Sequence, residues 1–165
     1  MFRVRETRML FPAARRPVNS TVMWLIRMDE VDRDIDRLSG IDRDEIYAAT
    51  LSLCEMADRA RPRLLQVLND QHARSIVRCR VADTLGMIGD RSTADDLIRA
   101  LNDVEVRVRW HALRALAKIG AANAVPALRH LAVHDTGEFE ITPTVRIVMK
   151  HEAQKAIDQI QTGAS

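Results

Sequence analysis

The stretch VRCRVADTLGMIG, from Val77 to Gly89, decides the fold because a close copy of it follows along the chain. The copy, VRVRWHALRALAKIG, is displaced by 31 residues, so that Val77 aligns with Val108 and Gly89 with Gly120. Self-similarity at a period of 20 to 50 residues is typical of stacked repeat architectures, and this period fits one pair of helices per unit. The sequence therefore predicts a repeat array whose function depends on its exposed side chains.

The amino-acid composition indicates a helical protein. Of the 165 residues, 47% are hydrophobic but only 4% are aromatic, and the apolar residues are mostly Ala, Leu, Val, Ile and Met. These residues suit closely packed helices better than a sheet sandwich. The chain is long enough for one domain whose core needs neither disulfides nor metal. We predict an all-α fold, an α–α superhelix (α-solenoid) of about four antiparallel helix pairs.

The repeat pattern also predicts the organisation of the chain. Residues 1–18 carry five arginines against one glutamate, together with two prolines. We expect a flexible Arg-rich arm there, with a transit peptide or a phosphate-binding arm as alternatives. A single repeat domain would span residues 19–162. It would comprise a cap pair at 20–57 and units at about 58–89, 90–120 and 121–162, the last with an insertion at 132–144.

Charge and cysteine content narrow the cellular setting. The formal net charge is +2, so bulk charge does not demand a nucleic-acid or membrane partner. Cys54 and Cys79 are the only cysteines, and both fall in predicted helices, where a free thiol usually behaves as a small buried hydrophobe. The apolar run at residues 22–26 is far shorter than a membrane span. We expect a cytoplasmic protein without disulfides.

The repeated motif resembles a known family. A Leu-Asn-Asp turn, then Val-Arg, then Ala-Leu-x-x-Ile-Gly is similar to the short HEAT-like repeats first described in phycobilisome lyases, and the similarity covers roughly residues 58–160. In such repeats the turn Asp and the Val-Arg arginine tend to join in a ladder along the stack. Lys150 departs from the arginine pattern, as does the longer gap between Asp70 and Arg78. The resemblance implies a structural role for Asp70, Asp103, Arg78, Arg109 and Lys150.

The sequence predicts no catalytic site, no cofactor and no metal. Deoxyhypusine hydroxylase, a related HEAT-like enzyme family, holds two irons with His-Glu pairs, but here His151-Glu152 is the single such pair. His130 and His134, beside Asp135, have the spacing of a helical metal site or are solvated residues at a helix end. The acidic run at residues 29–45 fits a solvated face better than a calcium loop. No GxSxG motif or phosphate-binding glycine loop is present, so an enzyme is not indicated.

Exposed positions on the second helix of each unit predict the partner surface. In a stacked array these helices line one face, usually concave, and equivalent positions form columns across units. The insertion offers a rival surface at Phe139, which either contacts a partner or folds back onto the end of the stack. The predicted contact residues are Arg80, Asp83, Met87, Arg107, His111, Arg114, Lys118, Glu152, Lys155 and Phe139.

Three functional hypotheses follow. The leading one is a non-catalytic scaffold that binds another protein, as an adaptor or accessory subunit. The second is a nucleic-acid binder that uses the basic arm and the basic column residues, although base-stacking aromatics are scarce on this face. The third, which rests on the resemblance, is an accessory protein similar to bilin lyases. The sequence does not identify the partner.

Overall fold

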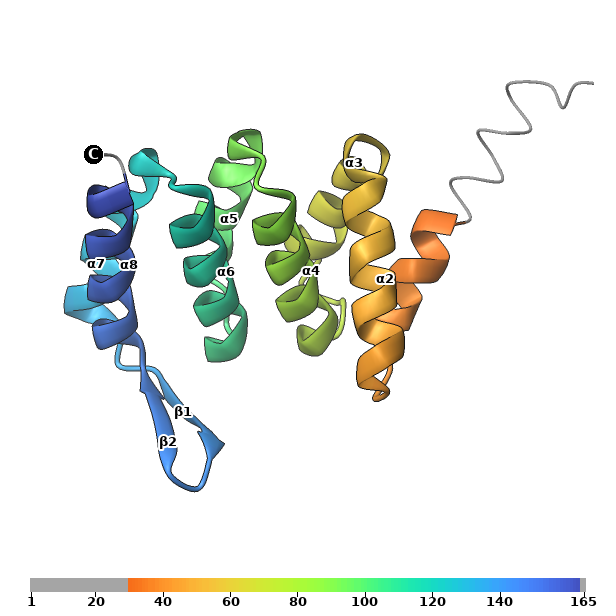
Figure 1. Cartoon of the computed structure of the whole chain (residues 1–165). Coiled ribbons are helices and arrows are strands. Elements are labelled where there is room, and N and C mark those ends of the chain that lie inside the picture. Colours follow the sequence, from red (N-terminus) through yellow and green to blue (C-terminus); the bar gives the residue numbers. More distant parts are fainter. Residues whose placement is uncertain (1–29, 164–165) are drawn as a thin grey trace, which may run out of the picture.

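The computed structural model describes residues 30–163, which fold into a stack of helices with a short β-hairpin that projects from the stack between its last two helices (Figure 1). The predicted arm at residues 1–18 and the predicted start of the cap pair at residue 20 lie outside the described residues. Residues 30–37 are helical. They are followed by α2 (Arg43–Glu55), α3 (Ala57–Asn69), α4 (Ser75–Ile88), α5 (Ala94–Ala100), α6 (Val106–Ile119), α7 (Val125–His134), β1 (Glu138–Thr142), β2 (Val145–Val148) and α8 (Met149–Gly163).

The helices form two layers. In the layer that we call the inner layer, α4 packs against α2 and α6, and α6 packs against α8. The second layer consists of α3, α5 and α7, which pack against α4, α6 and α8 of the inner layer, respectively. Residues 30–37 precede α2 as the first helix of a further pair, and Asp32 accepts a hydrogen bond from Arg63 of α3, so residues 30–163 hold four consecutive helix pairs. The predicted all-α solenoid is confirmed. No helix within residues 30–163 is long and apolar enough to cross a membrane.

Local signals in the sequence place the start of α2 and the ends of α4 and α6, whereas α3 begins at Ala57 and holds Pro62 inside the helix. Asp42 is the N-cap of α2, and its Oδ1 accepts hydrogen bonds from the backbone N–H groups of Asp44 and Glu45. Gly89 and Gly120 end α4 and α6 with φ of 75° and 65°, in the left-handed region that glycine adopts without a steric penalty. Each repeat therefore stops at its glycine and turns back into the next helix.

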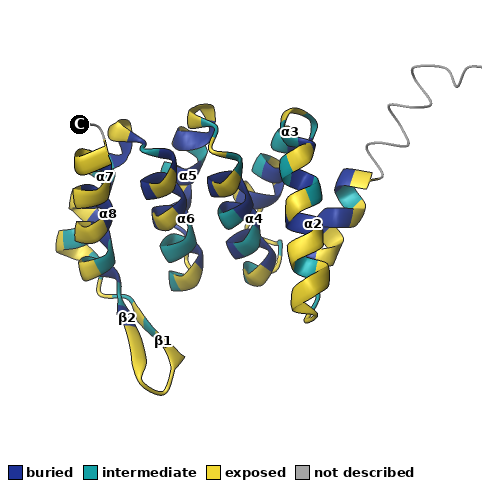
Figure 2. Ribbon diagram, in the orientation of Figure 1, coloured by how far each residue is buried: buried dark blue, intermediate teal, exposed yellow. Residues whose placement is uncertain are grey.

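The core is a repeating row of leucines between the two layers, shown as the dark blue inner sides of the helices in Figure 2. Equivalent residues of successive units are all fully buried, at 0% exposure. Burying one such side chain stabilises the fold by about 1.5–3 kcal/mol relative to exposure. The row on the outer-layer helices is Leu64, Leu97 and Leu128, and the row on the inner-layer helices includes Leu53, Leu85 and Leu116.

A ladder of arginine–aspartate pairs joins consecutive units. The guanidinium of Arg78 donates to both carboxylate oxygens of Asp103, at 3.0 and 2.9 Å, and to the carbonyl of Ala73 in its own turn. Arg109 repeats this arrangement with Asp135, at 2.8 and 3.0 Å, and with the carbonyl of Asp103 at 3.0 Å. Each arginine thus holds its own turn and the turn of the next unit in one bidentate fork.

The ladder differs from the set that the resemblance implies. Asp70 is exposed, and its carboxylate accepts from the N–H of His72 in its own turn, because the preceding unit carries Ile46 where an arginine would stand. Lys150 forms no ion pair among the described residues. Asp135, which the pattern missed, takes the last place in the ladder. Burial raises the pKa of Asp135, but the hydrogen bonds from Arg109 and the Gly137 N–H outweigh it and hold the pKa below its usual value.

The connection between α7 and α8 is a β-hairpin, which begins within the insertion predicted at 132–144 and extends beyond it to residue 148. α7 continues to His134, and β1 and β2 pair antiparallel, with Phe139 opposite Ile147 and Glu140 opposite Arg146. Apolar and polar residues alternate in β1 and in the first three residues of β2, a period of two that a search for helical spacing does not detect.

We predict that replacing Arg78 with Ala lowers the free energy of unfolding by about 3–5 kcal/mol, because Asp103 would keep a buried charge without its partner. Arg78 is 2% exposed and Asp103 4%. Urea denaturation would measure the change. Arg99→Ala, which removes an exposed i,i+3 pair with Asp96, is the control and should cost at most about 1 kcal/mol. Equal losses in both variants would contradict a special role for the ladder.

We also predict that Gly86→Ala destabilises the stack by about 1–3 kcal/mol, as expected of overpacking. A Cβ at residue 86 would lie 2.9 Å from Ala115 Cα, a backbone atom of α6 that cannot move aside freely. Thermal and urea denaturation would measure the loss. The matched change Gly163→Ala, where no atom of the described residues lies within 4 Å of the new methyl, should not destabilise. A fully stable Gly86→Ala protein would show that α4 and α6 can separate.

Candidate functional site

The inner layer contains an open groove of about 560 Å³ where α4, α6 and α8 meet. Its small residues are Gly86, Ala115, Ala117 and Ala156, all of which are buried between the three helices. Longer side chains stand around them. The groove is lined by Asp83, Met87, Leu113, Arg114, Lys118, Glu152, Lys155 and Gln159 in addition to the small residues.

The structure brings many of the predicted contact residues together in this groove. Asp83 and Met87 come from α4, one turn apart, and Arg114 and Lys118 occupy the equivalent positions of α6. The equivalent positions of α8 complete the lining. The predicted contact residues in the groove are Asp83, Met87, Arg114, Lys118, Glu152 and Lys155, whereas Arg80, Arg107, His111 and Phe139 do not line it.

Both carboxylates of the groove already face cations. Asp83 Oδ2 lies 2.8 Å from Nδ1 of His111, and its Oδ1 lies 3.8 Å from Arg114. The His111 contact is a charge pair once the ring is protonated and not a hydrogen bond, because Nδ1 has no hydrogen-bond partner with suitable geometry. Glu152 pairs with Lys155 at 2.6 Å. The negative charge of the groove is therefore largely compensated from within.

Aromatic contacts hold the wall of the groove. Trp110 donates from Nε1 to Glu152 at 3.4 Å, and the guanidinium of Arg114 lies 4.6 Å from the centre of the Trp110 ring. A cation over an indole ring at this distance is attracted by the ring's negative face. Trp110, which was not among the predicted contact residues, is thus a positioning residue for two members of the groove. The available signal was that it is the single tryptophan of α6.

Arg80 was predicted as a contact residue, but it is used inside the fold. Its guanidinium donates to the carbonyls of Leu38 and Gly40, the latter at 2.8 Å. These carbonyls follow the helix at residues 30–37, whose C-terminal end carries partial negative charge. The arginine therefore caps the first helix pair and is not available to a partner.

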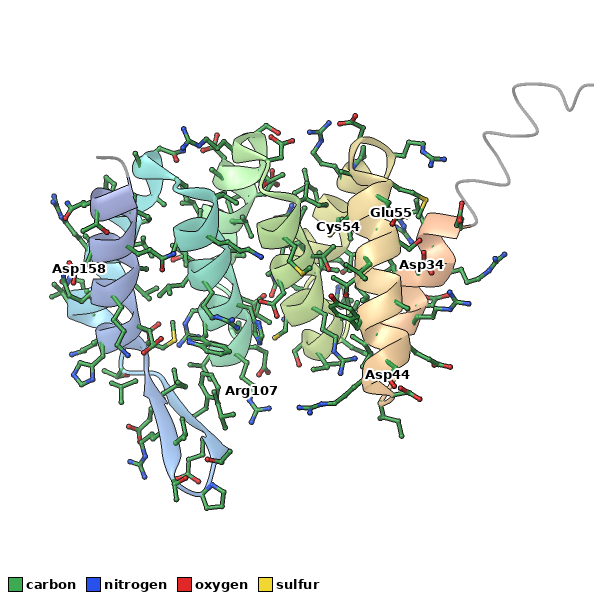
Figure 3. All side chains as sticks on the ribbon, viewed as in Figure 1. Asp34, Asp44, Cys54, Glu55, Arg107 and Asp158 are labelled. Carbon is green, nitrogen blue, oxygen red and sulfur yellow. The ribbon has the colours of Figure 1, made fainter. Side chains whose placement is uncertain are left out.

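Phe139 and Arg107 lie together at the base of the hairpin. The Phe139 ring packs edge-to-face on Trp110 with 5.5 Å between ring centres, and Arg107 lies 5.3 Å from the centre of the Phe139 ring. Arg107 is labelled in Figure 3, beside the strands. Phe139 is half-buried, so it fastens the hairpin to α6. It neither covers the end of the stack nor offers a fully exposed apolar contact.

The histidine pair on α7 has no third ligand. The rings of His130 and His134 lie 4.5 Å apart, centre to centre. Asp135 next to them is engaged by Arg109 and Gly137. Within residues 30–163, no cluster of three or more His, Cys, Asp or Glu side chains could hold a metal ion.

Sequence comparison gives the family. The family model for HEAT repeats matches residues 62–141, and that for the PBS lyase HEAT-like repeat matches residues 46–70. Residues 46–141 are HEAT-like repeats. The resemblance seen in the Leu-Asn-Asp and Val-Arg motifs is confirmed. No curated protein sequence matches the chain.

Structural comparison agrees with this family. The fold is similar to a chain in the structure of the complex of CpcE and CpcF of phycocyanin lyase from Nostoc sp. PCC7120, with a TM-score of 0.56 and 21% sequence identity. The alignment covers 96% of this HEAT-like chain but only 60% of the Nostoc chain. At this identity the similarity shows a shared fold.

We predict that Phe139→Ala loosens the hairpin and lowers the free energy of unfolding by about 1 kcal/mol, the usual contribution of an aromatic pair. Amide hydrogen exchange of residues 138–148 would measure the loosening. Ile141→Ala on the same strand is the control, because Ile141 is 52% exposed. Unchanged protection of the hairpin in Phe139→Ala would show that Trp110 does not hold it.

Proposed function

We propose that this HEAT-like protein binds a partner protein through the groove between α4, α6 and α8, as an adaptor or accessory subunit without a reaction of its own. The observation that carries the proposal is the groove itself. It combines a centre of buried small residues, such as Gly86 and Ala156, with exposed long side chains, such as Arg114 and Lys155, which are 51% and 72% exposed. A centre of small and apolar residues within a polar rim is the usual anatomy of a protein interface.

The size of the groove fits the central part of an interface. A stable protein–protein contact buries about 800 Å² on each partner, which is more than one groove of this volume supplies. A partner seated here would therefore extend onto neighbouring surfaces. The exposed apolar side chains of α2 lie in the same layer as the groove and supply further area.

Nucleic-acid binding, the second hypothesis from the sequence, is less well supported by this surface. Asp83 and Glu152 place carboxylates in the groove, where they would repel phosphates. Trp110 is covered by Arg114 on one side and contacted by Phe139, so the ring is not free to stack on a base. A bilin-lyase-like accessory role, the third hypothesis, rests on the fold of the Nostoc chain and would require pigment bound to the purified protein.

The test is an affinity pull-down from the native cell with the full chain and its Arg114→Glu and Lys118→Glu variants. Reversing a charge at an interface changes the binding free energy by up to several kcal/mol. A change of about 1.4 kcal/mol corresponds to a tenfold change in Kd. We expect recovery of the specific partner to change by at least about tenfold. Arg129→Glu is the matched control, because Arg129 is an exposed cation on α7 outside the groove.

Circular dichroism must show that all variants remain folded. Equal recovery of every partner by the wild type and both groove variants would remove the groove from the proposed function. Equal effects of Arg129→Glu and the groove variants would point to a general effect of net charge.

A further inference from the structure

The charge that remains unpaired in the groove is positive. Asp83 faces His111 and Arg114, and Glu152 faces Lys155, so each carboxylate has a cation within 4 Å. Lys118 is exposed, and it forms no ion pair among the described residues. The neighbouring column position on α8, Gln159, is neutral. An incoming side chain therefore meets one free ammonium group and no free carboxylate in this part of the groove.

An apolar patch lies on the inner layer on the α2 side of Lys118. Tyr47 and Leu51 stand one turn apart on α2 and are 61% and 39% exposed, and Met87 on α4 is 39% exposed. Leu51 occupies the column of Asp83 and Arg114, so this column changes from apolar on α2 to charged on α4 and α6. The next column holds the exposed Glu55 of α2 beside Met87 and Lys118. Burial raises the pKa of the Cys54 thiol on α2, and the charge of Lys118 opposes that rise.

We propose that the groove binds an acidic segment of a partner protein that pairs a carboxylate with Lys118 and lays apolar side chains over Leu51 and Met87. This inference rests on the proposed function and names the chemistry of the partner. Apolar contact at the α2 side would supply most of the affinity, and the carboxylate would fix the direction and register of the segment.

Helix spacing sets the distance between the two kinds of contact. Neighbouring packed helices lie about 8–10 Å apart, so the axes of α2 and α6 are separated by about 16–20 Å. An extended chain advances about 3.3 Å per residue. In an extended segment, the apolar residue over Leu51 and the acidic residue at Lys118 would then be about five or six positions apart, and the apolar residue over Met87 about three positions from the acidic one.

Two segments of this chain are poorer occupants. Residues 1–18 are rich in arginine, and their charge would be repelled by Lys118 and Arg114. Residues 42–45 of a second copy are acidic and follow the exposed Ile41, but Arg43 lies among them. A second copy seated there would also leave its own groove open for a third copy, and so would build a chain of molecules.

The test uses a random peptide library of about a dozen residues, displayed on phage and selected on the full-length protein, a length that spans the whole surface. We expect the selected peptides to combine Asp or Glu with Leu, Ile, Phe or Met about five or six positions away. A synthetic peptide of the selected sequence should lose at least about tenfold in affinity in Lys118→Glu and in Leu51→Ser, and nothing in Arg129→Glu. Fluorescence anisotropy of the labelled peptide measures the Kd.

Several results would overturn the inference. They are a library that yields no peptide, a basic or uncharged consensus, and binding that Lys118→Glu leaves intact. A concentration-dependent rise in mass by analytical ultracentrifugation that Lys118→Glu abolishes would assign the groove to a second copy instead. A cellular partner whose recovery rises with Lys118→Glu would overturn the acidic segment but support the proposed function, so the two failures are distinguishable.

Discussion

The arrangement of the whole stack depends on a buried ion pair between consecutive turns. Arg78 and Asp103 are both almost fully buried, and either charge alone would cost several kcal/mol in that position. The pair is tolerated only where the turn of one unit meets the turn of the next in one register. That register brings α4 against α6 so closely that Gly86 touches the backbone of Ala115, and these residues line the groove. The ladder and the groove are therefore consequences of the same approach of two helices.

The second pair of the ladder also places the hairpin. Asp135 receives Arg109 and the N–H of Gly137, and the carbonyl of Gly137 accepts from the N–H of Met149 at the start of α8. A side chain at residue 137 would collide with Arg109, since its Cβ would lie 2.5 Å from the guanidinium. The chain thus leaves α7 in a fixed direction, so the hairpin begins beside α6 and meets Trp110 through Phe139. An insertion into the third unit is built on the same contact that holds the units together.

The sequence was most informative where the repeat itself carries the signal. Periodic leucines and the two glycines at the ends of α4 and α6 predict the helix pairs, and the columns predict which side chains of α4, α6 and α8 share a surface. Arg80 could not be assigned in this way, because the carbonyls that it binds belong to residues 38–40, which have no repeat equivalent. Asp135 was missed because the insertion shifts it out of the Leu-Asn-Asp pattern. The hairpin was missed because its two strands are short and alternate with a period that helical spacing does not detect.

The difference between repeated and non-repeated positions explains why the sequence identifies the family but not the partner. Positions that repeat, such as Leu85 and Leu116, are buried and determine the backbone. Positions that differ between units, such as Met87 and Lys118, face the groove and determine what can bind there. A HEAT-like stack can therefore keep its geometry through a few buried contacts while its inner surface changes one side chain at a time. In this chain one column runs from the apolar Leu51 on α2 to Arg114 on α6 and Lys155 on α8, and that order, more than any single residue, gives the surface a direction.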